Sequence, residues 1–312
     1  MSIDSGNKVY LIGAGPGNPN LLTKKAERLI RKADVILYDR LVNPLILQYA
    51  PATSEVIDVG KKPYVKHIQQ DDINLKIVEA AQKHQTVVRL KGGDPAIFGR
   101  VTEEVNTLKQ YNISYEIVPG VTSASAAVAT MDLGLTMRAV APSVTFSTGH
   151  FKNSSNHDTD IRNLLNGGTL AIYMGVKRLG NIIQQISQFT DEDYSIAIVF
   201  NATCYNQKVV TGRLSNIEHQ LQQLQLDGEP GICILGAIID YIDVEHIVGS
   251  NYSFDDTLYI IKGSKEDVLI EAEIRSDRGQ RCLVDYGAQY HSSQEQVYQR
   301  IIETNNIKYI EV

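Results

Sequence analysis

The stretch VVRLKGGDPAIFGR, residues 87–100, decides the fold. Its β-branched start predicts a strand, and a helix is expected from Arg100 onward. Gly92 and Gly93, followed by Asp-Pro, end the strand. Because glycine lacks a Cβ and accepts positive φ, backbone at such a turn can approach a ligand closely. The pattern therefore predicts either a ligand site at the carboxyl edge of an α/β sheet or an ordinary strand-to-helix turn.

Composition describes an ordinary globular protein. The chain has 312 residues, enough for about two domains, with 43% hydrophobic and 21% charged residues. A net charge of −6 argues against bulk nucleic-acid binding, but leaves room for a basic pocket that takes an acidic small molecule. The three cysteines lack the spacing of a zinc site or disulfide framework, and no apolar run is long enough to span a bilayer. We expect a cytoplasmic protein without a metal and without nucleic-acid or membrane partners.

Alternating strand and helix patterns surround the central stretch. Strands are expected at residues 9–12, 34–38, 55–59 and 115–118, which predicts a mostly parallel sheet. After a junction at residues 133–142, a second run predicts strands at 143–148, 169–173, 196–200, 208–211 and 232–239. We therefore predict an α/β fold with an N-terminal α/β domain (1–135) and a C-terminal α/β domain (136–242).

The last segment, residues 243–312, has a different pattern. Short strands are expected at 258–261, 268–274 and 282–284, and a helix at 295–303. This predicts a small α+β extension of unknown role, in which no residue pattern indicates chemistry.

The glycine-rich string GAGPGNP, residues 13–19, follows the first strand but does not fit a dinucleotide fingerprint. That fingerprint needs glycine at position 18, where Asn18 stands. Pro16 also removes a backbone donor that a pyrophosphate would use. A nicotinamide oxidoreductase is therefore disfavoured.

Two further features are candidates for a site. Asp39 follows the second strand, where it either caps the chain or faces a ligand. Lys61, Lys62, Lys66 and His67 form a basic cluster that is either a solvated loop or part of an anion pocket.

Ten strings occur together in one order: VYLIGAGPG, YDRLV, VGKK, QDDIN, VVRLKGGDPAIFGR, VPGVTSA, SVTFSTGH, GTLAIYMGV, NAT and a closing GxII-type strand. In this order they resemble the tetrapyrrole methyltransferases, and in particular those that act on uroporphyrinogen III. The resemblance covers roughly residues 9–239.

The resemblance implies two α/β domains with the ligand cleft between them, and a homodimer. It implies S-adenosyl-L-methionine as methyl donor, with S-adenosyl-L-homocysteine as product. The implied substrate is a small-molecule tetrapyrrole, uroporphyrinogen III. Methylation of its carbons 2 and 7 gives precorrin-2, the precursor of sirohaem and cobalamin.

The resemblance also implies roles for individual residues. Asp39 and Lys61 match positions with acid and base roles, and Arg100 is an alternative base. Because a guanidinium is rarely neutral, Asp39 is the favoured base and Arg100 a clamp for substrate carboxylates. The positions that match substrate-binding residues are Glu103, Arg138, His150 and Met174. The positions that match donor-binding residues are Pro16, Gly92, Gly93, Asp94, Ile97, Thr122, Ser123, Met174 and Ala202.

The sequence departs from the family pattern at six positions: Asn18, Lys66, Thr102, Met137, Phe200 and Ala237. The donor positions are nearly intact, so the departures bear on tetrapyrrole specificity, rate or dimer contacts. They leave two alternatives, a methyltransferase of a later corrin intermediate and a non-catalytic tetrapyrrole-binding protein.

Overall fold

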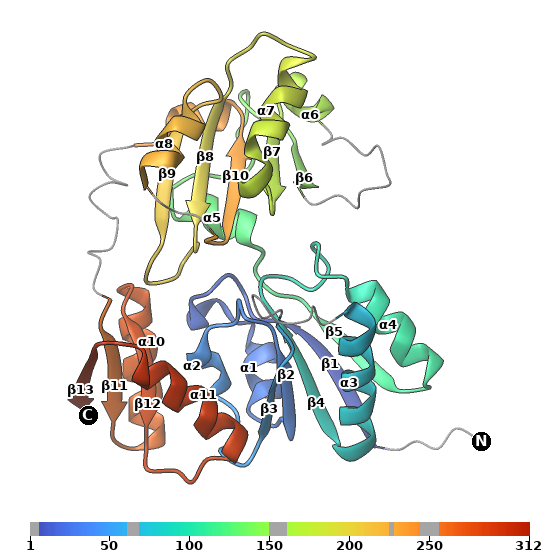
Figure 1. The fold of residues 1–312 in the computed structure, drawn as a ribbon, viewed down its shortest axis with the longest axis vertical. Coiled ribbons are helices and arrows are strands. Elements are labelled where there is room, and N and C mark those ends of the chain that lie inside the picture. The colour runs from blue at the N-terminus through green and yellow to red at the C-terminus, as the bar shows by residue number, and fades with distance from the viewer. Residues whose placement is uncertain (1–5, 61–68, 150–160, 225–227, 244–255) are drawn as a thin grey trace. The chain divides into compact units, whose positions relative to one another are not determined.

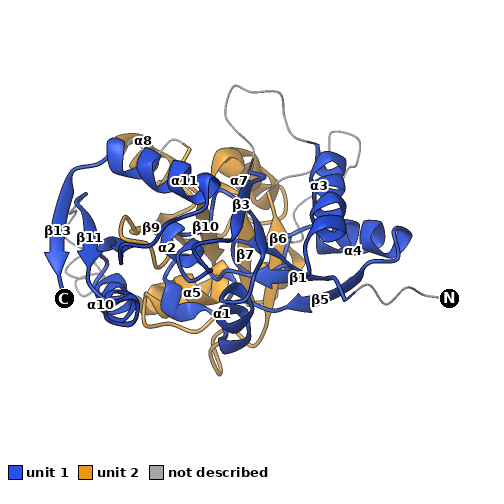
Figure 2. Cartoon of the chain, turned by 90° about the horizontal axis from the view of Figure 1, so that it is seen from below, with its two compact units in different colours: residues 1–122, 255–312 blue, residues 123–254 orange. Residues whose placement is uncertain are grey.

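The computed structural model describes residues 6–60, 69–149, 161–224, 228–243 and 256–312 (Figure 1). Contacts divide the chain into two units (Figure 2). Unit 1 comprises residues 1–122 and 255–312, and unit 2 comprises residues 123–254. The predicted domain limits are based on the sequence pattern, whereas these two units are defined by contacts between residues. The contacts group the C-terminal segment with the N-terminal residues in unit 1.

Unit 1 contains a five-stranded, fully parallel sheet in the order β3-β2-β4-β1-β5. The central strand β4 (Thr86–Lys91) contains the first five residues of the deciding stretch, VVRLK. Because all strands run the same way, their carboxyl ends share one edge, as predicted. The other strands are β1 (Lys8–Gly13), β2 (Val35–Tyr38), β3 (Glu55–Asp58) and β5 (Ser114–Val118).

Helices cover both faces of this sheet. On one face, α3 (Gln70–Lys83) and α4 (Val101–Gln110) bury apolar side chains in a core with β1, β2 and β4. On the other face, α1 (Lys24–Ile30) and α2 (Pro44–Leu47) pack in a second core. A short 3₁₀ helix, η1 (Pro19–Leu21), lies between β1 and α1.

The C-terminal extension alternates strand and helix, shown in red in Figure 1. Its parallel strands have the order β12-β11-β13. Its elements are β11 (Leu258–Lys262), α10 (Lys265–Asp277), β12 (Arg281–Asp285), α11 (Ser292–Glu303) and β13 (Ile307–Glu311).

The strand predicted at residues 268–274 is wrong, because these residues lie in helix α10. The Ser264 hydroxyl accepts from the backbone N–H of Asp267 and caps the helix. Val268, Ala272 and Ser276 are buried at a spacing of four residues, which suits one face of a helix. With this helix in place, the small C-terminal extension of strands and helices that the sequence predicts is a β-α-β-α-β unit.

The extension packs against the N-terminal part of unit 1. Its apolar residues belong to the same buried cluster as those of α1 and α2. The buried Gln48 side chain donates to the Val284 carbonyl and accepts from the Val284 N–H, both at 2.8 Å. Gln294 is fully buried and donates to the carbonyls of Pro51 and Ser54 at 2.9 and 2.7 Å. The extension therefore covers an apolar face that would otherwise meet water.

Unit 2 contains a mixed five-stranded sheet in the order β6-β7-β10-β8-β9. Strands β6 and β7 pair in parallel, and the other neighbouring strands of this order pair antiparallel. The strands are β6 (Val144–Thr148), β7 (Thr169–Tyr173), β8 (Ser195–Phe200), β9 (Lys208–Arg213) and β10 (Gly231–Leu235). The helices are α5 (Ser123–Ala129), α6 (Arg162–Leu165), η2 (Val176–Arg178), α7 (Leu179–Ser187), α8 (Ile217–Leu224) and η3 (Ala237–Tyr241). Among the described residues, no helix combines the length and apolar character required to cross a bilayer.

Glu116 on β5 joins three elements of unit 1 and makes stability depend on pH. Its carboxylate accepts from Lys25 and, at 2.8 Å, from Lys8, and these hydrogen bonds lower the pKa of Glu116 from its ordinary value of 4.5 to about 2. Because the folded-state pKa is depressed, this stabilisation is present above about pH 4.5 and is lost as the pH falls toward about 2.

We expect Glu116→Gln to lower the free energy of unfolding at pH 7 by about 1 kcal/mol, since the site is partly exposed. Urea denaturation across this pH range checks the effect. The difference from the wild-type protein should shrink as the wild-type carboxylate becomes protonated. A difference that stays constant down to about pH 2 would contradict the assignment.

Candidate functional site

Three glycines meet at the carboxyl edge of the unit 1 sheet. A Cβ placed on Gly13 would lie 2.6 Å from the Gly93 carbonyl oxygen, and one on Gly120 would lie 2.5 Å from the same oxygen. No side chain fits at these distances, so the turns after β1, β4 and β5 pack backbone against backbone. The deciding stretch thus forms the tight glycine turn that the sequence predicts.

The turn after β4 is fixed on both sides. Gly93 and Gly15 exchange backbone hydrogen bonds of 2.7 and 3.2 Å, which join it to the turn after β1. The Asp94 carboxylate accepts from the N–H of Gly120 at 3.0 Å and from the N–H of Ala96 at 2.7 Å. Asp94 was predicted as a donor-binding residue, and in this structure its oxygens hold the two turns together.

Gly93 itself faces open space. Its φ of 70° lies in the left-handed region, and a Cβ there would meet no atom within 4 Å. The neighbouring Gly92 packs against Leu41, which is 61% exposed. The open space at Gly93 lets a ligand approach the backbone of this turn.

Asp39 is the exposed end of a buried charge network. It follows β2, and its Oδ1 accepts from Nη2 of Arg89 at 2.7 Å. Arg89 is 2% exposed and also donates from Nε to Glu104 at 3.1 Å. Lys91 donates to the same Glu104 oxygen at 2.7 Å. Two cations and two carboxylates thus run from the core to the sheet edge, with Asp39 partly exposed at its end.

The three buried members of this network were not predicted as site residues. Burial, together with the neighbouring Arg89 charge, lowers the pKa of Lys91. A signal for them exists in the sequence: Arg89 and Lys91 alternate with Val88 and Leu90, so both face the same side of the strand. Their shared partner Glu104, on α4, could not be identified from that pattern.

Arg100 and Glu103 lie together at the start of α4. The guanidinium donates from Nε and Nη2 to the two Glu103 oxygens, in a two-pronged pair. This pairing raises the pKa of Arg100, which keeps the side chain cationic. Both side chains are nearly half exposed, at 44% and 47%. The structure thus brings together a predicted base or clamp and a predicted substrate residue.

Strained backbone follows three of the strands. Positive φ angles occur at Phe98 and Arg100 after β4, at Met174 after β7, and at Asn201 and Thr203 after β8. Such conformations cost free energy in residues other than glycine, and in proteins they cluster at functional sites. Part of the strain therefore lies in turns where site residues are predicted, and further positive φ angles occur at Asn112, Asp132 and Ala139.

Two of the predicted residues of unit 2 lie at one edge of its sheet. Tyr173 pairs with Ile232 and Phe200 pairs with Gly231, so β7 and β8 both end beside the start of β10. Met174, 53% exposed, and Ala202, buried, follow these two strand ends. Met174 and Ala202 thus lie on either side of β10 at the same edge.

The remaining predicted residues lie in turns of both units or outside the described residues. Pro16 is in the turn after β1, and Ile97 is half-buried in the turn after β4. Thr122 ends unit 1 and Ser123 begins α5 in unit 2. Arg138 is exposed in a tight turn between Met137 and Ala141. Lys61 and His150 lie outside the described residues, as do Lys62, Lys66 and His67.

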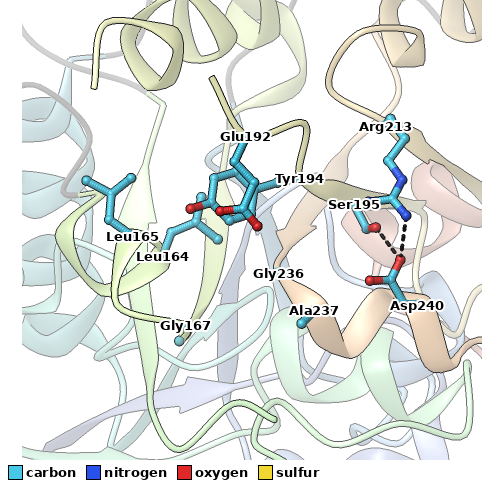
Figure 3. A pocket seen from close by; sticks show the side chains of 11 residues that line it. Leu164, Leu165, Gly167, Glu192, Tyr194, Ser195, Arg213, Gly236, Ala237 and Asp240 are labelled. Atoms are coloured by element: carbon cyan, nitrogen blue, oxygen red, sulfur yellow. Dashed lines mark hydrogen bonds and ion pairs between the residues drawn. The ribbon is translucent and has the colours of Figure 1, made fainter. Parts of the chain in front are cut away.

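A separate pocket of about 200 Å³ lies at the opposite edge of the unit 2 sheet (Figure 3). The residues around it come from α6, from the starts of β7 and β8, from the end of β9, and from the segment that leads from β10 into η3. Asp240 accepts from Ser195 at 2.5 Å and from Arg213 at 3.1 Å, as the dashed lines show. Of the predicted site residues that the structure describes, none lines this pocket.

Comparisons with known proteins agree with the resemblance. A uroporphyrinogen-III C-methyltransferase of Priestia megaterium is 43% identical over 236 residues, which cover 75% of this chain and 99% of that one. One of Methanocaldococcus jannaschii is 38% identical over 238 residues, covering 76% and 98%. The crystal structure of uroporphyrin-III C-methyl transferase from Thermus thermophilus, complexed with S-adenyl homocysteine, matches with a TM-score of 0.65 and 36% identity, covering 76% of this chain and all of that one.

The family model described as Tetrapyrrole (Corrin/Porphyrin) Methylases matches residues 8–218. This match contains the glycine turns of unit 1, the charge network, and Met174 and Ala202 of unit 2. The chain therefore belongs to the tetrapyrrole methylase family.

Proposed function

We propose that this chain transfers methyl groups from S-adenosyl-L-methionine to carbons 2 and 7 of uroporphyrinogen III, giving precorrin-2. The observation that carries the proposal is the packing of Gly13, Gly93 and Gly120, which presents open backbone at the sheet edge. The relatives that share about 40% of the sequence bear the name of this activity. The product would feed sirohaem or cobalamin synthesis.

The residues at the glycine turns suit the methyl donor. Gly93 offers backbone and open space, its neighbour Gly92 packs against the exposed Leu41, and the exposed Phe98 follows in the same turn. An adenosine with an amino-acid tail needs both polar backbone groups and apolar contacts. The donor supplies an activated methyl group, so the protein's task is to align it with a ring carbon of the substrate. The residues that would hold it are Pro16, Gly92, Gly93, Asp94, Ile97, Thr122, Ser123, Met174 and Ala202.

Asp39 is the proposed base. Methylation of a pyrrole carbon must be followed by loss of a proton from the macrocycle, and a carboxylate can accept it. The short bond to Arg89 fixes the Asp39 side chain at the end of β2. In this account Arg89 is a positioning residue, and the network behind it keeps Arg89 in place. Lys61, which the family pattern pairs with Asp39, is proposed as the partner acid or base.

Arg100 is the proposed clamp for a substrate carboxylate. The substrate carries acetate and propionate groups, which a guanidinium fork binds well. Because Glu103 raises the pKa of Arg100, a neutral guanidine able to accept a proton is disfavoured. Glu103, Arg138, His150 and Met174 are the other proposed substrate residues.

We expect Arg100→Ala to spare donor binding and to remove most turnover. Loss of one carboxylate clamp should lower kcat/KM about 100-fold, since a charge-assisted pair contributes about 1.5–3 kcal/mol. Calorimetry with S-adenosyl-L-homocysteine measures binding at the donor site, and a turnover assay measures the loss of activity. Arg28→Ala is the control, since this exposed arginine on α1 lies outside the proposed site. Wild-type turnover in Arg100→Ala would contradict the role.

The activity itself is tested by release of S-adenosyl-L-homocysteine under anaerobic conditions. The proposal predicts release only when uroporphyrinogen III is present. A porphyrinogen in which methyl groups replace the four acetates should react poorly, because the clamps would lack partners. Equal release of S-adenosyl-L-homocysteine with this porphyrinogen and with uroporphyrinogen III would point to a different substrate.

We infer further that the enzyme is a cytoplasmic homodimer, on the basis of the family resemblance. Light scattering on the purified protein tests the oligomeric state. A mass close to twice 34.6 kDa is expected, and a monomer at all concentrations would contradict the inference.

A further inference from the structure

The extension touches the turn that follows β1. Asn18, in that turn, donates from Nδ2 to the carboxylate of Asp277 at 2.7 Å. Asn20 donates to the backbone carbonyl of Glu273, one helical turn earlier in α10, at 3.0 Å. Helix α10 thus holds the segment of residues 18–20 at two points.

The same turn is tied to the open glycine at the sheet edge. Gly15 exchanges backbone hydrogen bonds with Gly93, and the Gly17 carbonyl accepts from Asn43 at 3.0 Å. Residues 15–20 therefore lie between the glycine turn on one side and α10 on the other. A displacement at Asn18 would be carried over only three residues to the Gly15–Gly93 bridge.

The Asn18 amide and the Asp277 carboxylate are complementary hydrogen-bond partners. Asp277 is the last residue of α10, where the negative end of the helix disfavours a carboxylate. An amide donor at 2.7 Å offsets this cost. The Asn18 oxygen also accepts from the Asn20 N–H, so the side chain uses its donor toward the extension and its acceptor to cap η1. A carboxylate at position 18 could cap the helix but would face the carboxylate of Asp277.

We propose that the C-terminal extension positions the turn of residues 15–20, which contains the proposed donor-binding residue Pro16. Asp277 does so through its hydrogen bond with Asn18. The proposal rests on the donor site proposed above. It assigns a role to the part of the chain beyond the family model, which ends at residue 218. Asn18 is one of the departures from the family pattern, and its contact with the extension explains why an uncharged amide suits this chain.

The test is a double-mutant cycle in which calorimetry measures the affinity for S-adenosyl-L-homocysteine. Asn18→Asp should weaken binding about tenfold, because it places two carboxylates within hydrogen-bond distance. Asp277→Asn should bind within about twofold of the wild-type protein, since its amide oxygen can still accept from Asn18. The double variant Asn18→Asp/Asp277→Asn should recover most of the affinity, because donor and acceptor have changed places.

Tyr49→Phe is the matched control. It removes the hydrogen bond of 2.6 Å from Tyr49 to the Glu273 carboxylate, which joins the extension to the N-terminal part of unit 1, and it leaves in place the Glu273 backbone carbonyl that accepts from Asn20. We expect a lower melting temperature and unchanged affinity. Equal affinity in Asn18→Asp and wild type, or no recovery in the double variant, would overturn the proposal. A wild-type protein that fails to bind the ligand would instead overturn the proposed function.

Discussion

Replacing Gly93 with valine is expected to abolish donor binding. The residue has a φ of 70°, which a β-branched side chain adopts only at considerable cost. Its side chain would also fill the open space that we assign to S-adenosyl-L-methionine. We expect the affinity for S-adenosyl-L-homocysteine to fall at least about 100-fold, with turnover lost in parallel. Calorimetry on the full chain measures this directly.

Gly287→Val is the matched control. Gly287 lies in the extension and has a φ of 69°, and a Cβ placed on it would likewise meet no atom within 4 Å. Both variants should therefore lose about 1–2 kcal/mol of stability through backbone strain. Only Gly93→Val should lose the ligand. Equal binding by the two variants would contradict the assignment of the donor site.

Replacing Glu104 with glutamine is expected to cause a large loss of stability. The Glu104 side chain is fully buried and compensates both Arg89 and Lys91. Its neutral replacement would leave two buried cations facing an amide. Breaking a buried network in this way costs about 3–5 kcal/mol, which urea denaturation can measure. We also expect turnover to fall, because Arg89 would no longer be held against Asp39.

The adjacent residue offers a control with the same chemistry. Glu103→Gln removes one charge from a side chain that is 47% exposed. Its free energy of unfolding should change by no more than about 0.5 kcal/mol. Equal stability losses in Glu103→Gln and Glu104→Gln would mean that the buried network does not hold unit 1 together.

The glycine turns and the two strand–helix runs could be predicted because their signals are local. A β-branched run ends at Gly92–Gly93, and small residues mark the close approach. Helix α10 could not be separated from a strand by its apolar residues alone. There the decision comes from the Ser264 cap and the four-residue spacing of buried positions, which together outweigh the β-branched Val268.

The contacts that shape the site depend on pairing between distant parts of the chain. Asp39 and Arg89 meet across neighbouring strands, 50 residues apart in sequence. Asn18 and Asp277 meet across 259 residues. Sequence pattern places each residue at the end of a strand or helix, but it does not specify which distant partner it meets. The role of Asp94 in joining two turns was missed for the same reason.

The most direct test of the account is to count the methyl groups that the enzyme adds. Purified protein would be incubated anaerobically with S-adenosyl-L-methionine and enzymatically prepared uroporphyrinogen III, and the tetrapyrrole analysed by mass spectrometry. We expect a gain of two methyl groups, located at carbons 2 and 7. An unchanged tetrapyrrole, from protein that still binds S-adenosyl-L-homocysteine, would contradict it and point to a later corrin intermediate or to a binding role.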